Sequence, residues 1–414
     1  MKLTNSSSSQ KPGPLDGIKV VEYGVFHAGP GGGAILGDLG AEVIKIEADA
    51  GDPIRYWTQV GGLNMAMKNG ESLMFEVSNR NKKGIYLDIK TEKGREVMER
   101  LVKDADVFLT NLRKPTKIKM KLDYESIKKI NPKIIHASVS GYGLKGPLSE
   151  IGAFDPLGQA CSGMMFVTGS SVPAPLHMGI LDQATAISLS HSIITALFHR
   201  ERKGVGQEVH VSLYGTALWL QHPNLMVSNA LGQNPCLPQD RYKHSPLRNA
   251  FCCKDNRWLF GTHHPEEKYW ETFCRITGQE HLFTDPKFTN EKGQPINLAE
   301  LVDLFDQIFL TKNSSEWMEI FLENRMMFCP IHRIDDVEKD PQALVNNYVV
   351  PAEYRGIGQV NLPGYPAYFS ECDAGIRHEA PRMGEHTDMI LKEAGYSPEE
   401  IDQLKLEGAA KSLD

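Results

Sequence analysis

The sequence lacks the features that mark several common classes of protein. Its 414 residues contain no run that approaches eighteen consecutive apolar residues, so no transmembrane helix and no membrane partner are predicted. The start, MKLTNSSSSQKPGP, has no apolar core of the secretory type. The seven cysteines include no CxxC pair, which gives no disulfide or zinc framework and favours a reducing compartment. We therefore expect a cytoplasmic protein.

Basic charge is also scarce. The chain has 45 Lys and Arg against 52 Asp and Glu, which gives a formal net charge of −7. A nucleic-acid-binding protein needs a concentrated basic face, so no nucleic-acid partner is predicted. Hydrophobic residues make up 41% and charged residues 23% of the chain. This composition is typical of a folded globular protein and excludes global disorder.

Several catalytic motifs are missing as well. The chain has no GxSxG, Walker A or HExxH sequence. His263 and His264 are adjacent, so in a strand they would face opposite sides, and no third metal ligand has a suitable spacing. We interpret them as part of a solvated turn and predict no metal site. Cys161 has no histidine or helix start nearby to lower its pKa, so we interpret it as a core residue.

What the chain does contain is an alternation of strand and helix patterns. Residues 18–23 (IKVVEY) have the β-branched composition of a buried strand, and a glycine-rich turn at 29–33 leads to a helix at 34–39 that Gly40 ends. The pattern then predicts strands at 43–47, 84–87, 107–110 and 134–138, a helix that Thr91 caps and that runs to about Lys103, and a helix at 124–130. Such alternation predicts the α/β class, with a Rossmann-like, doubly wound, mostly parallel sheet.

Changes in amino-acid composition along the sequence predict the division of the chain into parts. A long helix is expected at 181–200 and a half-buried strand at 208–213, after which aromatic residues, Asn and Pro become more frequent. The predicted parts are a disordered tail (1–14), a large Rossmann-like domain (15–227), a smaller α+β domain (228–335), a connecting arm (336–384) and a C-terminal segment with two short helices (385–414).

The glycines near the first strand are similar to a dinucleotide-binding fingerprint. Gly29, Gly31 and Ala34 fit the spacing, and Glu47 ends the next strand. In that fingerprint the first glycine follows the strand directly, whereas here Gly-Val-Phe-His-Ala intervenes after Tyr23. The spacing therefore favours glycines needed for close packing or for another ligand over a dinucleotide site.

Asp182 is the residue that stands out by its surroundings. It lies in HMGILDQATAISLS, at the start of an otherwise small and apolar helix, where an acidic residue either caps the helix or carries chemistry. The preceding Gly163, Gly169 and Gly179 indicate a close approach of backbone around a pocket. Composition and spacing leave both roles of Asp182 open.

Taken together, separate segments from residue 15 to the end resemble the class III CoA-transferases, which include formyl-CoA:oxalate and carnitine CoA-transferases. The matching segments are LDGIKVVEYG (15–24), AGPGGGAILGDLGAEVIKIE (28–47), GDPIR (51–55), NRNKKGIYLDIKTEKG (79–94), ASVSGYGLKGP (137–147), FDPLGQACSGMM (154–165), LDQATA (181–186), GVGQEVHVSL (204–213) and MGEHTDMIL (383–391). The resemblance implies that Asp182 is the catalytic nucleophile and that the C-terminal segment returns to the large domain. It further implies two protomers threaded through each other, as a homodimer or as a heteromer with a paralogous subunit.

The resemblance also implies the substrates and their contacts. An acyl-CoA and a free carboxylic acid react, with coenzyme A entering as a thioester substrate and no permanently bound cofactor. The matching positions for CoA binding are His27, Ala28, Leu87, Lys90, Asn111, Lys119 and Tyr142. Solvated surface charge is the alternative role for Lys90 and Lys119. The chain departs from the family at Ala48, where some members have a basic residue, in the loop 111–121, and in 239–246, which lacks the glycine run of some members.

Two other functions are alternatives to CoA transfer. The α-methylacyl-CoA racemases resemble this chain, but they use a histidine where Phe154 stands, and Phe154 cannot move a proton. A supporting subunit without activity would not need Asp182. Residues Met164–Phe166, Trp219 and Met226 are compatible with a bulky or arylalkyl acid as the acyl group. Benzylsuccinate or an aryl-lactate, with a donor such as succinyl-CoA, fits this interpretation, and core packing is the alternative role of those side chains.

Overall fold

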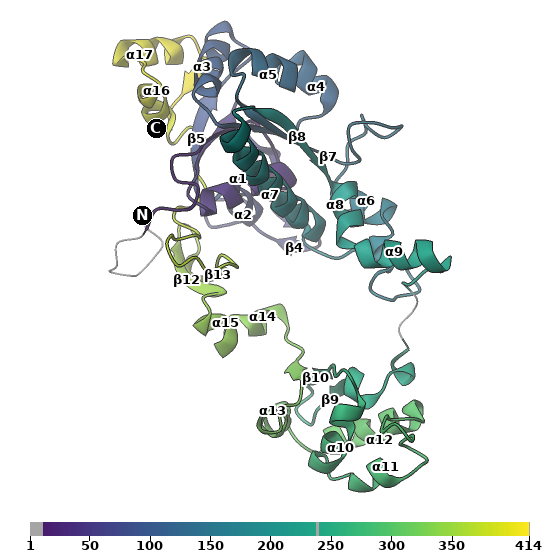
Figure 1. Ribbon diagram of the computed structural model, residues 1–414. Coiled ribbons are helices and arrows are strands. Elements are labelled where there is room, and N and C mark those ends of the chain that lie inside the picture. Colours follow the sequence, from purple (N-terminus) through teal and green to yellow (C-terminus); the bar gives the residue numbers. More distant parts are fainter. Residues whose placement is uncertain (1–10, 237–239, 414) are drawn as a thin grey trace. The chain divides into compact units, whose positions relative to one another are not determined.

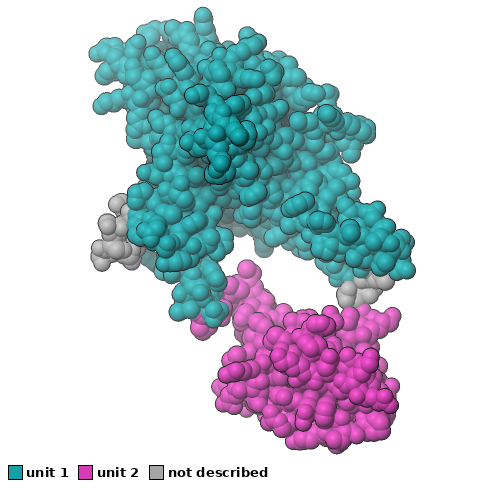
Figure 2. Space-filling model, in the orientation of Figure 1, with its two compact units in different colours: residues 1–237, 342–414 teal, residues 238–341 magenta. Residues whose placement is uncertain are grey.

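The structure, a computed structural model, describes residues 11–236 and 240–413. Its contacts divide the chain into a first unit of residues 1–237 and 342–414 and a second unit of residues 238–341 (Figure 2). The division falls after the predicted boundary at 228, because helix α9 (His222–Leu231) continues through that position. Part of the predicted tail, residues 1–10, lies outside the described residues, whereas residue 11 is bound in place, with the Lys11 backbone N–H donating to Asp373 at 2.7 Å.

A seven-stranded sheet forms the centre of the first unit (Figure 1). Six strands run parallel and the C-terminal strand is antiparallel at one edge. In spatial order they are β14 (Ala410–Lys411), β5 (Lys82–Leu87), β2 (Glu42–Glu47), β1 (Lys19–Glu22), β6 (Val107–Thr110), β7 (Ile135–Ser140) and β8 (Gln207–Ser212). The chain winds outward from β1 in both directions, which confirms the predicted α/β class with a parallel central sheet.

Helices cover both faces of this sheet. Neighbouring strand residues face opposite sides, so Val20 packs in one core and Val21 in the other. One face carries α1 (Ala28–Asp38), α7 (Ile180–Lys203) and α8 (Leu213–Leu220), and the other carries α3 (Glu92–Lys103), α5 (Tyr124–Ile130), α16 (Thr387–Glu393) and α17 (Pro398–Leu406). The cap of α3 is as predicted, with Thr91 Oγ1 accepting from the Gly94 N–H at 3.0 Å. The C-terminal helices therefore pack on the large unit.

The glycine-rich segment forms the start of helix α1, so the prediction of a turn at 29–33 was wrong. Glycine is a poor helix former, but here the lack of a side chain allows α1 to approach its neighbours. A Cβ at Gly32 would lie 2.7 Å from the Leu189 side chain of α7, and one at Gly33 would lie 2.2 Å from Glu22 Oε2. Close packing against α7 and β1 thus outweighs the low helix propensity.

A cluster of buried charges lies between α1 and the sheet. Glu22 accepts hydrogen bonds from Lys82 Nζ on both carboxylate oxygens at 2.8 Å and from Lys45 Nζ at 3.3 Å, and all three side chains are inaccessible to solvent. Lys45 also pairs with Asp52 at 3.0 Å. Burial lowers the pKa of Lys82 to about 7, against the attraction of Glu22. The cluster joins β1, β2 and β5 beneath the start of α1.

The remaining elements of the first unit surround the ends of the strands or form the arm. They are β3 (Gln59–Val60), β4 (Leu63–Asn64), α2 (Leu73–Asn79), α4 (Lys114–Lys119), α6 (Asp155–Cys161) and the hairpin β12 (Val349–Tyr354) with β13 (Gly358–Pro363). Single 3-10 turns lie at Pro53–Arg55 and Met164–Phe166. No helix among the described residues is both long and apolar enough to cross a membrane.

The second unit has an antiparallel sheet and an aromatic core. The sheet order is β11 (Phe328–Pro330), β10 (Trp258–Gly261) and β9 (Ala250–Cys252), and the helices are α10 (Glu267–Ile276), α11 (Glu280–Thr284), α12 (Leu298–Phe309), α13 (Ser314–Glu323) and α14 (Ile334–Val337), with α15 (Pro341–Val345) at the junction. His263 is fully buried, with Nδ1 2.9 Å from the Leu247 carbonyl oxygen and Nε2 accepting from the Met327 N–H at 2.8 Å. The interpretation of His263 as part of a solvated turn was therefore wrong. Among the described residues no group of His, Cys, Asp or Glu could hold a metal ion.

Candidate active site

Asp182 lies in the first turn of α7. The turn is entered through Gly179, whose φ of 68° lies in the left-handed region that favours glycine. In the part of the chain that the structure describes, no hydrogen bond reaches the Asp182 carboxylate. Burial, followed by repulsion from Asp155, raises the pKa of Asp182 to about 7. The helix N-terminus favours the anion, but these two effects outweigh it.

Asp155, at the start of α6, holds the N-terminus of α7. Its Oδ2 accepts hydrogen bonds from the backbone N–H groups of Leu181 at 2.7 Å and of Asp182 at 2.9 Å. Its Oδ1 accepts from the side chain of Gln159, which also bonds the backbone of Leu176. Asp155 thus performs the capping role that was the alternative for Asp182, and the Asp182 carboxylate is left free for chemistry. The role of Asp155 was missed in the sequence, where FDPLGQ gave no local sign of a partner in α7.

His27 connects three helices and contacts Gln183, the residue after Asp182. Its ring lies at the start of α1, with Nδ1 2.8 Å from Ser78 Oγ of α2 and Nε2 2.8 Å from Gln183 Oε1 of α7. Burial lowers the pKa of His27 to about 4, so the imidazole is neutral at pH 7. A neutral ring can orient Gln183 and the adjacent Asp182 without adding charge. Ser78 and Gln183 were missed in the sequence, because no local pattern pairs them with His27.

A groove opens at the carboxyl ends of the parallel strands. The cavity measures about 260 Å³ and is lined by residues that follow β1, β2 and β5, namely Tyr23, Gly24, Val25, residues 46–52, Asp88 and Lys90. It adjoins the position where the chain begins to wind in the opposite direction, between β1 and β6, and open α/β sheets bind ligands at such positions. The groove reaches Val25, two residues before His27 in the chain, and its lining includes neither His27 nor Asp182.

The residues predicted to bind CoA differ from one another in where they lie and in how exposed they are. Lys90 is exposed at the groove and Lys119 is exposed on α4, which follows β6. Tyr142 is partly buried in the loop after β7, and Ala28 begins α1. Leu87 has no exposed surface, so its side chain supports the groove from within the core. Asn111 bonds the backbone of Val25 with both ends of its side-chain amide. Its Oδ1 accepts from the Val25 N–H at 2.9 Å, and its Nδ2 donates to the Val25 carbonyl oxygen at 2.6 Å.

Three aromatic side chains adjoin the polar residues of the site. The ring centroids of Phe26 and Phe154 are 5.2 Å apart in an edge-to-face arrangement, and Trp57 lies 5.9 Å from Phe26 and 6.4 Å from Phe154. Phe26 precedes His27 in the chain and Phe154 precedes Asp155. Trp57 is 43% and Phe154 is 54% exposed. This aromatic cluster offers an apolar surface that includes the neighbour of Asp155, the residue that bonds the Asp182 N–H. Trp219 and Met226, in contrast, lie exposed on α8 and α9.

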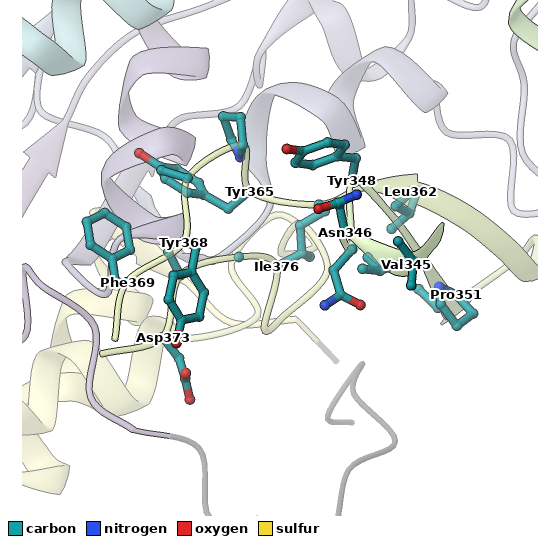
Figure 3. A pocket seen from close by; sticks show the side chains of 18 of the residues that line it. Val345, Asn346, Tyr348, Pro351, Leu362, Tyr365, Tyr368, Phe369, Asp373 and Ile376 are labelled. Atoms are coloured by element: carbon teal, nitrogen blue, oxygen red, sulfur yellow. The ribbon is translucent and has the colours of Figure 1, made fainter. Parts of the chain in front are cut away.

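Two larger cavities lie elsewhere and do not include Asp182 or His27. One, of about 560 Å³, is formed by residues 345–376, and Figure 3 shows the aromatic rings of Tyr348, Tyr365, Tyr368 and Phe369 around it. Asp373 is the only charged residue among those that line it. A cavity of this composition has no cation for the phosphates of CoA. The other, of about 1260 Å³, is lined by residues from the segments 11–19, 37–43, 81–83 and 377–393 and by Arg355.

Comparison with known proteins places this chain in a family. A family model described as CoA-transferase family III matches residues 15–387. The chain belongs to this family, which confirms the resemblance seen in the sequence.

The matching relatives include CoA-transferases that are named for different acids. The chain is 32% identical to the (R)-2-hydroxy-4-methylpentanoate CoA-transferase of Clostridioides difficile, over 94% of this chain and 98% of that protein. It is 30% identical to the cinnamoyl-CoA:phenyllactate CoA-transferase of Clostridium sporogenes, over 94% and 96%. The crystal structure of a CAIB/BAIF family protein from Brucella suis superimposes with a TM-score of 0.80 at 28% identity, covering 93% of this chain and 100% of that one.

Proposed function

We propose that the protein transfers CoA from an acyl-CoA to a free carboxylic acid through covalent intermediates on Asp182. The observation that carries this proposal is the Asp182 carboxylate itself, which is desolvated and receives no hydrogen bond from the described residues. The next residue in the chain, Gln183, contacts His27. A carboxylate without solvation is a stronger nucleophile. Coenzyme A is a substrate in this scheme, and no step needs a metal ion or ATP.

The first half of the reaction moves CoA to the enzyme. The Asp182 carboxylate attacks the thioester carbonyl, the C–S bond breaks, and the CoA thiolate leaves a mixed anhydride behind. The thiolate then attacks the Asp182 carbonyl carbon and releases the donor as its free carboxylate, which leaves an aspartyl-CoA thioester. Both intermediates hydrolyse readily, so the low solvent exposure of this position protects them.

The second half runs in reverse with the acceptor acid. The acceptor carboxylate attacks the aspartyl thioester and forms a second anhydride, and the thiolate attacks the acceptor carbonyl to give the new acyl-CoA. One oxygen of the acceptor stays on Asp182. A single turnover with an ¹⁸O-labelled acceptor is therefore expected to place one ¹⁸O in the peptide that contains Asp182, as measured by mass spectrometry. Transfer without labelling of that peptide would show that the acids exchange CoA directly.

The pH dependence of transfer is expected to report the environment of Asp182. Because its pKa is raised to about 7, kcat/KM should fall as the pH decreases through 7, when the carboxylate becomes protonated. Asp155→Asn removes the repelling charge but retains an oxygen that can cap α7. The fall of kcat/KM should therefore occur at a lower pH in this variant than in the wild type. Rate profiles of both proteins between pH 5 and 9 measure the shift. A fall of kcat/KM at the same pH in both proteins would mean that the charge of Asp155 does not affect the pKa of Asp182.

For the acyl group we propose a bulky or arylalkyl acid such as an aryl-lactate or benzylsuccinate, with a donor such as succinyl-CoA. The aromatic cluster supports this, and the two named relatives act on acids with branched or aromatic side chains. Phe154→Ala is expected to lower kcat/KM for phenyllactate about tenfold and to change the value for acetate much less, because the lost aromatic contact is worth about 1 kcal/mol or more. Tyr368→Ala, at a side chain that is 91% exposed in the arm, serves as the control. Equal losses with both acids would contradict the proposal.

We also propose that the working form is a dimer. None of the side chains of α9 is buried, and Trp219 and Met226 are 74% and 64% exposed. Large exposed apolar patches of this kind mark interaction surfaces. The chain has a mass of 46.2 kDa, and light scattering on the purified chain should give twice that value. The mass of a monomer would leave the heteromer with a paralogous subunit as the working form.

A further inference from the structure

The four residues 24–27, here called the strap, join strand β1 to helix α1. Gly24 and Val25 line the groove, while Phe26 belongs to the aromatic cluster and His27 contacts Gln183. The strap therefore connects the groove, the aromatic cluster and the contact between His27 and Gln183. Phe26 has a φ of 60°, in the left-handed region that a bulky side chain rarely adopts. Such a conformation persists only where the surroundings hold it.

The first two residues of the strap are held by side chains from neighbouring strands. Lys45 of β2 donates to the Gly24 carbonyl oxygen at 2.9 Å. Asn111, which follows β6, bonds both the N–H and the carbonyl oxygen of Val25. These bonds fix the chain on both sides as it leaves β1.

Asp52 holds the third residue, at the point of the unusual backbone. Its Oδ1 accepts from the Phe26 N–H at 2.9 Å and from the Ile54 N–H at 3.1 Å, and its Oδ2 accepts from Lys45 at 3.0 Å. Asp52 is 1% exposed and Lys45 is fully buried. The carboxylate therefore has one oxygen for the strap and one for the charge cluster.

We propose that Asp52 is a positioning residue for CoA transfer, which holds Phe26 in its left-handed conformation and so directs the Phe26 ring onto Phe154 and the His27 ring onto Gln183. This inference rests on the proposed function. Asp52 is also among the residues that line the groove, but it is only 1% exposed, and it acts on the reacting groups through the strap. A misplacement of about 1 Å at a reacting group can cost roughly 100-fold in rate, so the effect belongs in kcat rather than in binding.

Two substitutions at the same position separate positioning from stability. Asp52→Asn and Asp52→Ala both remove the ion pair with Lys45, so both should lower the urea midpoint. Asp52→Ala should lower it further, because it also leaves the N–H groups of Phe26 and Ile54 without an acceptor. Only Asp52→Asn retains an oxygen that can accept from the Phe26 N–H. We expect Asp52→Ala to lose about 10–100-fold in kcat and Asp52→Asn to stay within about threefold of the wild type. Equal losses of kcat in the two variants, measured where both are fully folded, would overturn the proposal.

Asn111→Ala gives a test that leaves the charge cluster intact. It removes both bonds to Val25, so kcat should fall about tenfold while KM for the acyl-CoA stays within about threefold. A raised KM with unchanged kcat would show that Asn111 contacts CoA, and it would overturn the role of the strap. Wild-type turnover is measured first in the same assay. No transfer by the wild type would refute the proposed function, whereas a normal kcat in Asp52→Ala beside an active wild type would refute only the positioning role.

Discussion

Asp182→Asn is expected to lower the rate of CoA transfer by about 10⁴-fold or more, because an amide oxygen cannot form the anhydride. The substitution keeps the shape of the side chain, and the cap of α7 remains on Asp155. Formation of the new acyl-CoA, followed by chromatography, measures the rate. Asp402→Asn changes an exposed carboxylate on α17 and should leave the rate unchanged. Substantial activity in Asp182→Asn would mean that another group is the nucleophile.

The same substitution should stabilise the fold at high pH. The pKa of Asp182 is about 7 in the folded protein against an ordinary value of 3.8, so between these values the folded state holds more protons than the unfolded state. Stability of the wild type at this site therefore falls as the pH rises from about 4 to about 7. The variant avoids this loss, which amounts to as much as about 4 kcal/mol. Urea unfolding should give the two proteins equal unfolding free energies near pH 4 and a higher value for the variant at pH 8. A lower value for the variant at pH 8 would contradict the burial of the Asp182 charge.

Glu22→Gln is expected to cost about 3–5 kcal/mol of unfolding free energy. Glu22 compensates the charges of Lys82 and Lys45 in a place that solvent does not reach, and an amide removes the carboxylate that pairs with Lys82 and leaves Lys45 paired with Asp52 alone. Urea unfolding at pH 6 measures the loss, because Lys82, with a pKa of about 7, is charged there. Glu96→Gln breaks an ion pair with Lys93 whose side chains are about half exposed, and it should change stability by less than about 1 kcal/mol. Equal effects of the two substitutions would show that the buried cluster contributes no more than a surface pair.

Local patterns predicted most of the fold. Strands β1, β2, β6 and β7 follow from buried runs rich in β-branched residues, and α3 begins where Thr91 provides a cap and a periodic apolar face follows. The start of α1 was not predictable in this way. Its glycines are poor helix formers, and what holds them in a helix is the close approach of α7, more than 140 positions later in the chain. Propensity describes a segment alone and cannot include such a neighbour.

The site was predictable only in part, for a similar reason. Asp182 is conspicuous because an acidic residue interrupts a small and apolar helix start. The residues that act on it are not conspicuous: Asp155 lies 27 residues earlier, and Ser78 and Gln183 become partners of His27 only when three helices meet. Glu22 lies in a strand that looks buried and apolar, and its partner Lys82 is 60 residues away. Pairing of this kind depends on the folded topology.

The covalent role of Asp182 is tested most directly by the mass of the intact protein. Wild type and Asp182→Asn are each mixed with a panel of acyl-CoAs, quenched in acid and weighed by mass spectrometry, with and without hydroxylamine. The account predicts an added acyl or CoA group on the wild type alone, removed by hydroxylamine, with the adduct on the peptide that contains Asp182. Turnover by the wild type with no adduct at any quench time, or the same adduct on Asp182→Asn, would contradict it.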